Sequence, residues 1–379
     1  METNFWKPSV TSQFAVCPVP YHLDTYHGCI YDCSYCFARD FVTFHRRNSD
    51  KGFTYLIGND PARFKKWIER TLAKDYDYTH SEEVAFKERI PLKIGATSDP
   101  FPLIERTEKI TYNALKALHE IDYPVQIQTK NPELLLEDHF RDLDNANHVI
   151  AVTIITTDEK FAKVCEPKAI SVERRLQAIK KLTDLGKKVI IKVQPAIYPK
   201  ILDDLPDMVK KFKDSGAFAF NIEGLKCRVT MPPSEKKIFQ KIGDFLEIPD
   251  LKTWFKIEGH RTTSDYEISI KHKSEYISLA KKLADEHGIE FYVADNCCYE
   301  SSCGAECCGT KVLHDYKLWG NNWRSNKFPT DNYSKELGKC FVKFTRNLKN
   351  KDNTLNLVMF ENYKDQFFRE IAHLRSRSA

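Results

Sequence analysis

SVERRLQAIKKLTDLGKKVIIKVQ, the stretch from Ser171 to Gln194, combines a helical pattern with a strand pattern. Apolar residues recur three or four positions apart in its first half, where Ser171 is a favourable N-cap residue and Gly186 a typical helix stop. The run at 188–194 is rich in β-branched residues, as strands are. A helix joined so closely to a strand predicts a parallel β/α unit.

The same alternation recurs along most of the chain. A second helical pattern runs from about Ser274 to His287 and ends at Gly288. The strand candidates are residues 91–97, 124–129, 149–155, 188–194, 217–222 and 290–294. With one more strand before residue 28, six or seven such units predict an α/β fold, a full or partial (β/α)6-8 TIM-type barrel. In such barrels the chemistry collects on the loops after the C-terminal ends of the strands.

The pattern changes near residues 296–310, where cysteines cluster and the strand and helix rhythm ends. We therefore expect the barrel in residues 1–295. Residues 296–379 are expected to form a cysteine-rich segment with a basic C-terminal extension, mostly helical, with its main helix at 337–374.

Composition excludes several classes of protein. The 379 residues are 42% hydrophobic and 29% charged, which describes a globular protein rather than a disordered chain. No apolar run approaches the roughly eighteen residues that span a membrane, and the N-terminal residues show no secretory pattern. We expect a cytoplasmic protein with no membrane partner. In a reducing cytoplasm, clustered cysteines usually bind metal or perform redox chemistry rather than form disulfides.

Positive charge is concentrated at the C-terminal end. Lys311 to Ala379 contain 14 basic and 7 acidic residues, a net charge of +7, so residues 1–310 carry −2 of the total of +5. Trp319, Trp323 and Arg324 lie in this basic part and are candidate nucleic-acid contacts, because indoles stack on bases and cations meet phosphates. A solvated helical surface and a small aromatic cap over the barrel explain the same residues.

Three cysteines lie close together in the stretch GCIYDCSYCFAR at residues 28–39. Cys29, Cys33 and Cys36 are spaced by four and three positions. A structural zinc site needs four closed ligands, whereas three thiolates on a 4Fe-4S cluster leave one iron open. An open iron at a barrel mouth is a place where a small molecule can chelate. Zinc binding and a reactive thiol are the alternatives.

This CxxxCxxC spacing, with Tyr35 directly before the third cysteine, resembles the radical S-adenosylmethionine (SAM) superfamily. The segments at 96–105, 128–131, 166–189 and 194–199 further resemble the spore photoproduct lyase-like branch, also described as DNA repair photolyases. The resemblance implies a 4Fe-4S cluster whose open iron binds SAM, and reductive cleavage of SAM to a radical that abstracts a hydrogen atom from substrate. It also implies nucleic-acid base modification or repair, and a one-electron donor of the flavodoxin or ferredoxin type.

Carried over by position, the resemblance also implies a set of SAM-binding residues. These are Tyr35, Ser98, Asp99, Lys130, Thr153, Arg175, Lys192 and Gln194. Ser98 and Asp99 would face the methionine end of SAM, and the residues from Lys130 onward its carboxylate or ribose. A structural role at the barrel rim explains each polar residue equally well. Lys192, on the inner face of a strand, needs a charged partner, for which the SAM carboxylate, Glu223 and Asp295 are candidates.

One position departs from the family pattern. Spore photoproduct lyases carry a cysteine directly before the TSD stretch that returns a hydrogen atom to the product, and here that position is Ala96. A methyl group donates no hydrogen atom. We therefore expect the hydrogen to come from elsewhere, or the radical to end in another reaction.

A second group of cysteines follows the last strand candidate. It comprises Cys297, Cys298, Cys303, Cys307 and Cys308. An auxiliary iron–sulfur cluster, a structural zinc, hydrogen-returning thiols and plain packing all explain it. An auxiliary cluster would suit radical modification of a peptide, a protein or a nucleotide-sized metabolite, and zinc would suit a non-catalytic nucleic-acid-binding protein.

Overall fold

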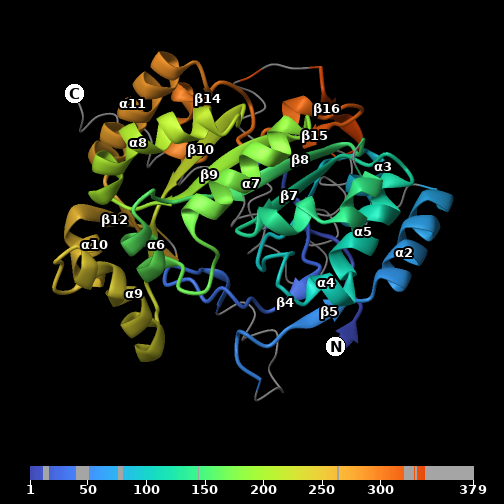
Figure 1. Cartoon of the computed structure of the whole chain (residues 1–379), viewed down its shortest axis with the longest axis horizontal. Coiled ribbons are helices and arrows are strands. Elements are labelled where there is room, and N and C mark those ends of the chain that lie inside the picture. The colour runs from blue at the N-terminus through green and yellow to red at the C-terminus, as the bar shows by residue number, and fades with distance from the viewer. Residues whose placement is uncertain are drawn as a thin grey trace, which may run out of the picture.

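The computed structural model describes residues 1–11, 17–39, 51–75, 80–143, 145–262, 264–319, 328 and 331–337, with the side chains of Asn296 and Cys297 left out. Its centre is one sheet of eight strands in the order β14-β10-β9-β8-β7-β6-β3-β2 (Figure 1). The strands are β2 (Ser9–Val10), β3 (Tyr21–Leu23), β6 (Leu92–Ile94), β7 (Val125–Thr129), β8 (His148–Thr153), β9 (Lys188–Ala196), β10 (Ala219–Gly224) and β14 (Glu290–Val293).

Seven of these strands are parallel, and β2 is antiparallel to β3 at one edge. Among the described residues β14 pairs only with β10, so the sheet is an open, partial barrel. The structure confirms the predicted fold class and all six strand candidates, together with the additional strand before residue 28. β3 supplies that strand.

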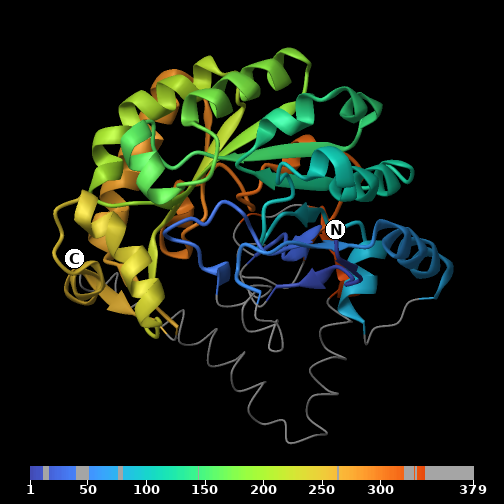
Figure 2. The same cartoon turned by 60° about the horizontal axis from the view of Figure 1, so that its bottom comes forward.

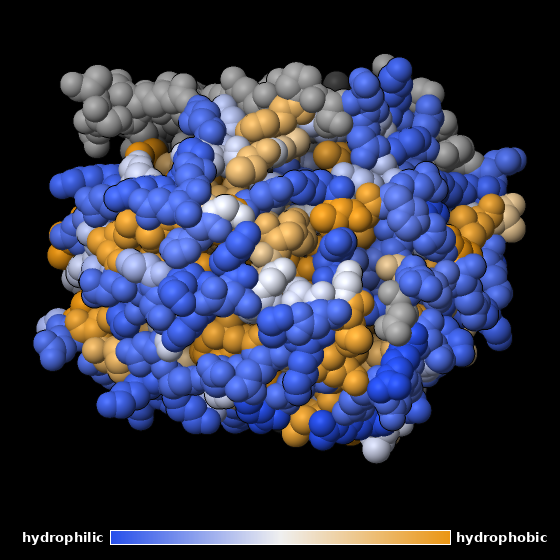
Figure 3. Space-filling model, turned by 45° about the horizontal axis from the view of Figure 1, so that its top comes forward, coloured by the Kyte–Doolittle hydropathy of each residue, from blue (hydrophilic) through white to orange (hydrophobic). Residues whose placement is uncertain are grey.

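Helices cover the convex side of the sheet, and the N-terminal segment lies on its concave side (Figure 2). The helices are α2 (Pro61–Ala73), α3 (Ser81–Lys87), α4 (Glu105–Glu108), α5 (Ile110–His119), α6 (Glu159–Cys165), α7 (Val172–Asp184), α8 (Lys200–Asp214), α9 (Pro233–Phe245), α10 (Leu251–Glu258) and α11 (Ile270–His287). The outer face drawn in Figure 3 is mostly hydrophilic, with separate hydrophobic patches between charged residues.

The two helices expected from the sequence are present. α7 begins after Ser171, whose hydroxyl accepts a hydrogen bond from the backbone amide of Arg174 at 3.3 Å. α11 begins after Ser269, earlier than the expected Ser274, and ends at Gly288 in the left-handed conformation. The amphipathic pattern of α11 weakens in its first turn, which explains the difference.

An insertion between β10 and α11 was not expected from the sequence. It contains α9 and α10 and a small antiparallel sheet. The strands of this sheet are β11 (Lys226–Arg228), β12 (Gly259–Arg261) and β13 (Asp265–Ile268). The remaining short strands are β1 (Thr3–Asn4), β4 (Tyr26–His27), β5 (Ile57–Asn59), β15 (Leu318–Trp319) and β16 (Tyr333–Ser334). Nearly all of the expected helix at 337–374 lies outside the described residues.

The segment after β14 folds back into the barrel. The backbone carbonyls of Cys307 and Cys308 accept hydrogen bonds from Asn221 on β10 and Gln126 on β7. Leu313 packs with residues on the inner face of the sheet, and His314 donates its amide to Asn147 just before β8 at 3.1 Å. Residues 303–319 therefore close the N-terminal end of the barrel, and we call them the floor segment. The boundary at 296 stays a prediction.

Candidate active site

The three-cysteine loop follows β4 and is anchored at both ends of its cysteine run. The amide of Cys29 donates to the carbonyl of Phe53 at 3.1 Å. Ser34 donates its amide to the carbonyl of Cys165 at 2.8 Å and its hydroxyl to the carbonyl of Val164 at 2.7 Å. These last two bonds attach the loop to the C-terminal end of α6, which holds the loop beside the mouth of the barrel.

The three thiols of this loop lie within electrostatic reach of one another. Burial raises the pKa of Cys29 to about 12, with the Asp99 carboxylate adding to the effect, and burial also raises the pKa values of Cys33 and Cys36. The ammonium of Lys130 opposes this by lowering the pKa values of Cys33 and Cys36. Protons on these thiols would be released when a metal binds.

Within the described ranges, no three Cys, His, Asp or Glu side chains converge as ligands of one metal ion. A 4Fe-4S cluster makes a different demand, because each thiolate binds its own iron and the sulfur atoms stay apart. Three neighbouring thiols from one anchored loop, with a lysine beside them, are a donor set that fits such a cluster.

Glu166 connects the cysteine loop to the strands. Its carboxylate accepts a hydrogen bond from the hydroxyl of Tyr35 and lies 2.5 Å from Nη1 of Arg175 and 3.9 Å from Nζ of Lys130. The same Arg175 nitrogen donates to the carbonyl of Thr153, at the end of β8, at 2.9 Å. The side chains of Glu166 and Arg175 are 0% and 1% exposed, so this pair is a buried structural joint. Nothing in the sequence marked Glu166.

Asp99 fastens the loop after β6 to the end of β7. Its carboxylate accepts hydrogen bonds from the hydroxyl of Thr129 at 2.8 Å and from the amides of Lys130 at 2.7 Å and Phe101 at 3.0 Å. Burial raises its pKa, while these bonds favour the carboxylate. Asp99 therefore lies beside Cys29, as expected of a residue at the SAM site, but its oxygens also order the backbone.

Asp24, which follows β3, also holds the loop after β6 in place. Its carboxylate accepts hydrogen bonds from the amides of Thr97 at 2.9 Å and Ser98 at 3.3 Å. Ser98 is buried and donates its hydroxyl to the carbonyl of Tyr26. The TSD stretch is thus held in place by β3 and β4. Sequence reasoning missed Asp24, although a carboxylate directly after a short strand is a detectable signal.

Gly95 sets the turn into this loop, with a φ angle of +91°. An added Cβ would lie 2.6 Å from the carbonyl oxygen of Gln128. Gly95→Ala is therefore expected to destabilise the protein by about 1–3 kcal/mol more than Gly186→Ala, because overpacking adds to backbone strain. Gly186 is the control, since its φ is +80° and nothing lies within 4 Å of its Cβ position. Urea unfolding measures the difference, and equal losses would contradict the expected clash.

Polar side chains line the concave face of the sheet near the ends of its strands. Partly buried polar side chains on this face come from four strands: Lys93 (β6), Gln128 (β7), Lys192 and Gln194 (β9) and Glu223 (β10). Inner positions nearer the strand starts, where the floor segment packs, are buried. These polar side chains lie towards the C-terminal ends of the strands, where barrel enzymes place the residues that bind substrate.

Lys192 lies inside the barrel as expected, but its contact differs from the expectation. Its Nζ donates to Oε1 of Gln128 at 2.6 Å. Asp295 instead accepts hydrogen bonds from Lys273 at 2.8 Å and from the amide of Gly224 at 2.8 Å. The suggestion that Asp295 pairs with Lys192 is therefore wrong, because Lys273 lies beside that carboxylate.

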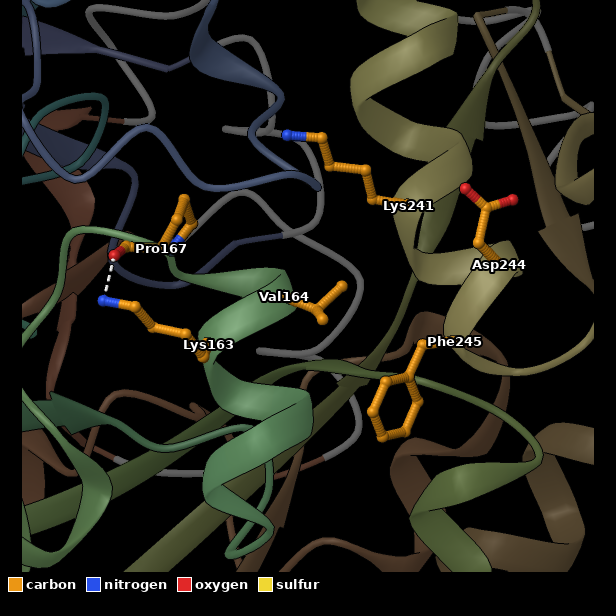
Figure 4. Close-up of a pocket in the computed structure, with 6 residues that line it drawn as sticks. All are labelled: Lys163, Val164, Pro167, Lys241, Asp244 and Phe245. Carbon is orange, nitrogen blue, oxygen red and sulfur yellow. Dashed lines mark hydrogen bonds between the residues drawn. The ribbon is translucent and has the colours of Figure 1, made fainter.

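A separate pocket of about 470 Å³ lies outside the barrel between α6 and α9 (Figure 4). Val164 and Phe245 face each other across it, and Lys163 donates to the carbonyl of Pro167 at 2.6 Å. Its lining residues come from α6, α9 and the segment after α6, and none comes from the strands of the central sheet. The candidate active site is therefore the concave face, which the cysteine loop borders.

Residues 23–212 match the family model of the radical SAM superfamily. The chain belongs to the radical SAM superfamily. The match begins at β3 and includes the cysteine loop and the strands up to β9. Members of this superfamily are enzymes that use SAM and a 4Fe-4S cluster, so the alternative of a non-catalytic zinc protein is set aside.

Two curated relatives match part of this radical SAM chain. An uncharacterized protein of the Acidianus two-tailed virus is 27% identical over 208 residues, 50% of this chain and 62% of the relative. An uncharacterized protein of Methanocaldococcus jannaschii is 25% identical over 186 residues, 48% of this chain and 62% of the relative. The chain thus covers less than two thirds of the length of these relatives.

Solved structures of spore photoproduct lyase share the radical SAM fold seen here. One is complexed with dinucleoside spore photoproduct and gives a TM-score of 0.52 at 14% identity. The match covers 77% of this chain and 80% of the lyase chain. Another is a mutant with bound AdoMet and the same dinucleoside, and it gives a TM-score of 0.51 at 15% identity. This match covers 75% of this chain and 80% of the mutant chain. At this identity the likeness extends to the fold alone.

The second cysteine group of this radical SAM protein is spread over different surroundings. Cys303 is exposed, Cys298 packs beside the main hydrophobic core, and Cys307 and Cys308 lie inside the barrel. The side chain of Cys297 is outside the described part. An auxiliary cluster or zinc at these residues stays a prediction that the described geometry does not favour.

Trp319 corrects one expectation about nucleic-acid contacts. It is 2% exposed and packs in a hydrophobic core, and its amide donates to the carbonyl of Pro18 at 2.8 Å. The prediction that its indole stacks on a base is wrong for this arrangement, because the ring already fills a core position. Trp323 and Arg324 lie outside the described residues. Within the described ranges, no helix is both long and apolar enough to cross a membrane.

Proposed function

We propose that the protein is a SAM-cleaving enzyme in which Cys29, Cys33 and Cys36 bind a 4Fe-4S cluster and the substrate is a nucleic-acid base. The observation that carries the proposal is the position of three neighbouring thiols on one anchored loop at the mouth of a parallel partial barrel. When bound, the cluster supplies the electron that cleaves SAM to a radical able to abstract hydrogen from substrate.

The chain's own residues bind, orient and shield the reactants. Lys130 has a largely buried side chain, 18% exposed, whose amine lies beside the cysteine loop, which suits it to the carboxylate of SAM. Gln194 is partly buried on the inner face, where a ribose hydroxyl can reach it. Thr153 and Arg175 are buried and contact one another, so they act by holding this rim in place.

Three observations support nucleic acid as the substrate. The sequence resembles the spore photoproduct lyase-like branch, the fold is shared with an enzyme whose structure contains a dinucleoside photoproduct, and the C-terminal part carries a charge of +7. A basic surface attracts phosphates and makes binding depend on salt. We also propose a cytoplasmic location and a one-electron donor of the flavodoxin or ferredoxin type.

Deuterium transfer tests this proposal. Anaerobically reconstituted protein is incubated with SAM, a reductant and deuterated DNA or RNA, and 5′-deoxyadenosine is analysed by mass spectrometry. We expect deuterium in 5′-deoxyadenosine from a base position, because the radical takes its hydrogen from the substrate held at the barrel mouth. Transfer only from a deuterated peptide or free metabolite would contradict the nucleic-acid substrate, and absence of SAM cleavage with every substrate would contradict the whole proposal.

A further inference from the structure

Two lysines inside the barrel have no acidic partner in the described part of the chain. Lys93 on β6 and Lys192 on β9 are both largely buried on the concave face. The Nζ atom of Lys192 bonds to Oε1 of Gln128 at 2.6 Å, and that of Lys93 lies 3.6 Å from Sγ of Cys17. Neither amine forms an ion pair with a described carboxylate, so both positive charges face neutral groups.

Two other lysines, Lys226 on β11 and Lys273 on α11, do pair with carboxylates. Nζ of Lys226 lies 2.8 Å from Glu223. Nζ of Lys273 lies 2.5 Å from Glu267 and 2.8 Å from Asp295. A charged amine removed from water is costly unless an anion is close. Among these four lysines, only Lys93 and Lys192 lack an acidic partner in the described part of the chain.

Asn221 adds an independent sign of a ligand. It lies on β10 directly beside Lys192 in the strand register and is 1% exposed. Its Nδ2 donates to the carbonyl of Cys307, whereas its Oδ1 is buried without a hydrogen-bond partner among the described residues. Buried polar atoms are nearly always paired, so this oxygen points to a ligand with a donor group.

The other titratable groups shift the pKa values of the two amines in opposite directions. Burial lowers the pKa of Lys192, and the positive charge of Lys93 lowers it further. The thiols of Cys308 and Cys307 and the carboxylate of Glu223 raise the pKa of Lys192, but burial outweighs them. Burial also opposes the charge on Lys93, but the thiols of Cys17, Cys308 and Cys307 outweigh it and raise its pKa.

Cys308 and Glu306 of the floor segment both have raised pKa values. A hydrogen bond with Cys307 and burial raise the pKa of Cys308, so this thiol is neutral. Burial raises the pKa of Glu306 to about 7, which leaves it only partly ionised at neutral pH.

We propose that Lys93, Lys192 and Asn221 form a binding site for a nucleotide unit of the substrate, with its phosphate between the two ammonium groups. A sugar hydroxyl or base N–H of the same unit donates to Oδ1 of Asn221. This inference rests on the proposed function and names the substrate group that reaches the floor segment. It also reassigns Lys192 from SAM to the substrate.

Calorimetry on the reconstituted protein with SAM, under anaerobic conditions, tests the site. The probes are the four deoxynucleoside 5′-monophosphates, the matching nucleosides and a single-stranded tetranucleotide. Loss of a hydrogen bond to a charged group costs about tenfold or more in affinity. We therefore expect each monophosphate to bind at least about tenfold more tightly than its nucleoside. Lys93→Met and Lys192→Met should each remove most of that advantage.

Lys188→Met is the matched control, because Lys188 is exposed at the start of the same strand as Lys192. It should leave all affinities unchanged. The lysine variants should keep the circular dichroism spectrum and melting temperature of the parent, since removing an unpaired buried charge does not weaken the fold. Lysine-dependent binding of the tetranucleotide alone would support the site and place the phosphate within a strand.

Equal affinities for nucleosides and monophosphates, together with tetranucleotide binding that does not depend on Lys93 and Lys192, would overturn the proposal. So would a Lys192→Met variant that loses SAM affinity and keeps nucleotide affinity, because the lysine would then belong to the SAM site. Lysine-dependent nucleotide binding by a protein that does not cleave SAM would support this site and contradict the proposed function, so the two can fail separately.

Discussion

Replacement of Cys36 by alanine is expected to abolish cluster binding and SAM cleavage together. The three thiols of the anchored loop are the proposed ligands, and loss of one leaves two, too few for a 4Fe-4S cluster that needs three with SAM on the fourth iron. Iron should fall from about four atoms per chain to near zero. Iron analysis and the yield of 5′-deoxyadenosine measure the two effects, and Cys29→Ala and Cys33→Ala should behave alike.

Cys303→Ala is the control for this experiment. Cys303 is exposed and lies in the second cysteine group, so its removal should leave both iron content and SAM cleavage unchanged. A Cys36→Ala protein that still releases 5′-deoxyadenosine at the parent rate would refute the ligand assignment. A Cys303→Ala protein that loses part of its iron would instead reveal an auxiliary cluster.

Arg175→Met is expected to lower the free energy of unfolding by about 3–5 kcal/mol, the usual loss when one partner of a buried ion pair is removed. The substitution leaves the carboxylate of Glu166 buried, with only Tyr35 and the more distant Lys130 beside it. It also removes the hydrogen bond to the carbonyl of Thr153. Urea unfolding of the anaerobic protein measures the loss.

The adjacent Arg174 provides the matched control. Its guanidinium pairs with Glu133 at the surface, where the two side chains are 56% and 28% exposed. Exposed pairs contribute about 0–1 kcal/mol, so Arg174→Met should change little. Similar losses in the free energy of unfolding for the two variants would mean that the buried Arg175–Glu166 pair stabilises the protein no more than the exposed Arg174–Glu133 pair does.

The parts of the fold with local signals were predictable. The strand at 188–194 and the helix after Ser171 follow from residues close together in sequence, and so does the spacing of Cys29, Cys33 and Cys36. The parallel order of the sheet then followed from the helix between each pair of strands. No comparable pattern marked the insertion with α9 and α10, because its short antiparallel strands alternate too few residues.

The contacts that join distant segments were not predictable. Glu166 follows α6 and looks like an ordinary surface carboxylate until Tyr35 and Arg175 are placed around it. Trp319 looked like an exposed aromatic in a polar stretch, yet it fills a core formed mainly by the N-terminal third of the chain. Burial of such residues depends on tertiary packing, which sequence periodicity does not report.

The floor segment imposes an order on assembly. Residues that line the concave side from β8 to β14, including Val149, Ile190 and Tyr292, are covered by residues 303–319. Until residues 303–319 have left the ribosome, the apolar inner face of the incomplete barrel is exposed to water. Contacts across so long a sequence separation form slowly and leave such surfaces prone to aggregation. The chain therefore needs residues 303–319 to cover the apolar inner face of the sheet. We expect a variant truncated after β14 to expose this face and to aggregate rather than to fold into a smaller enzyme.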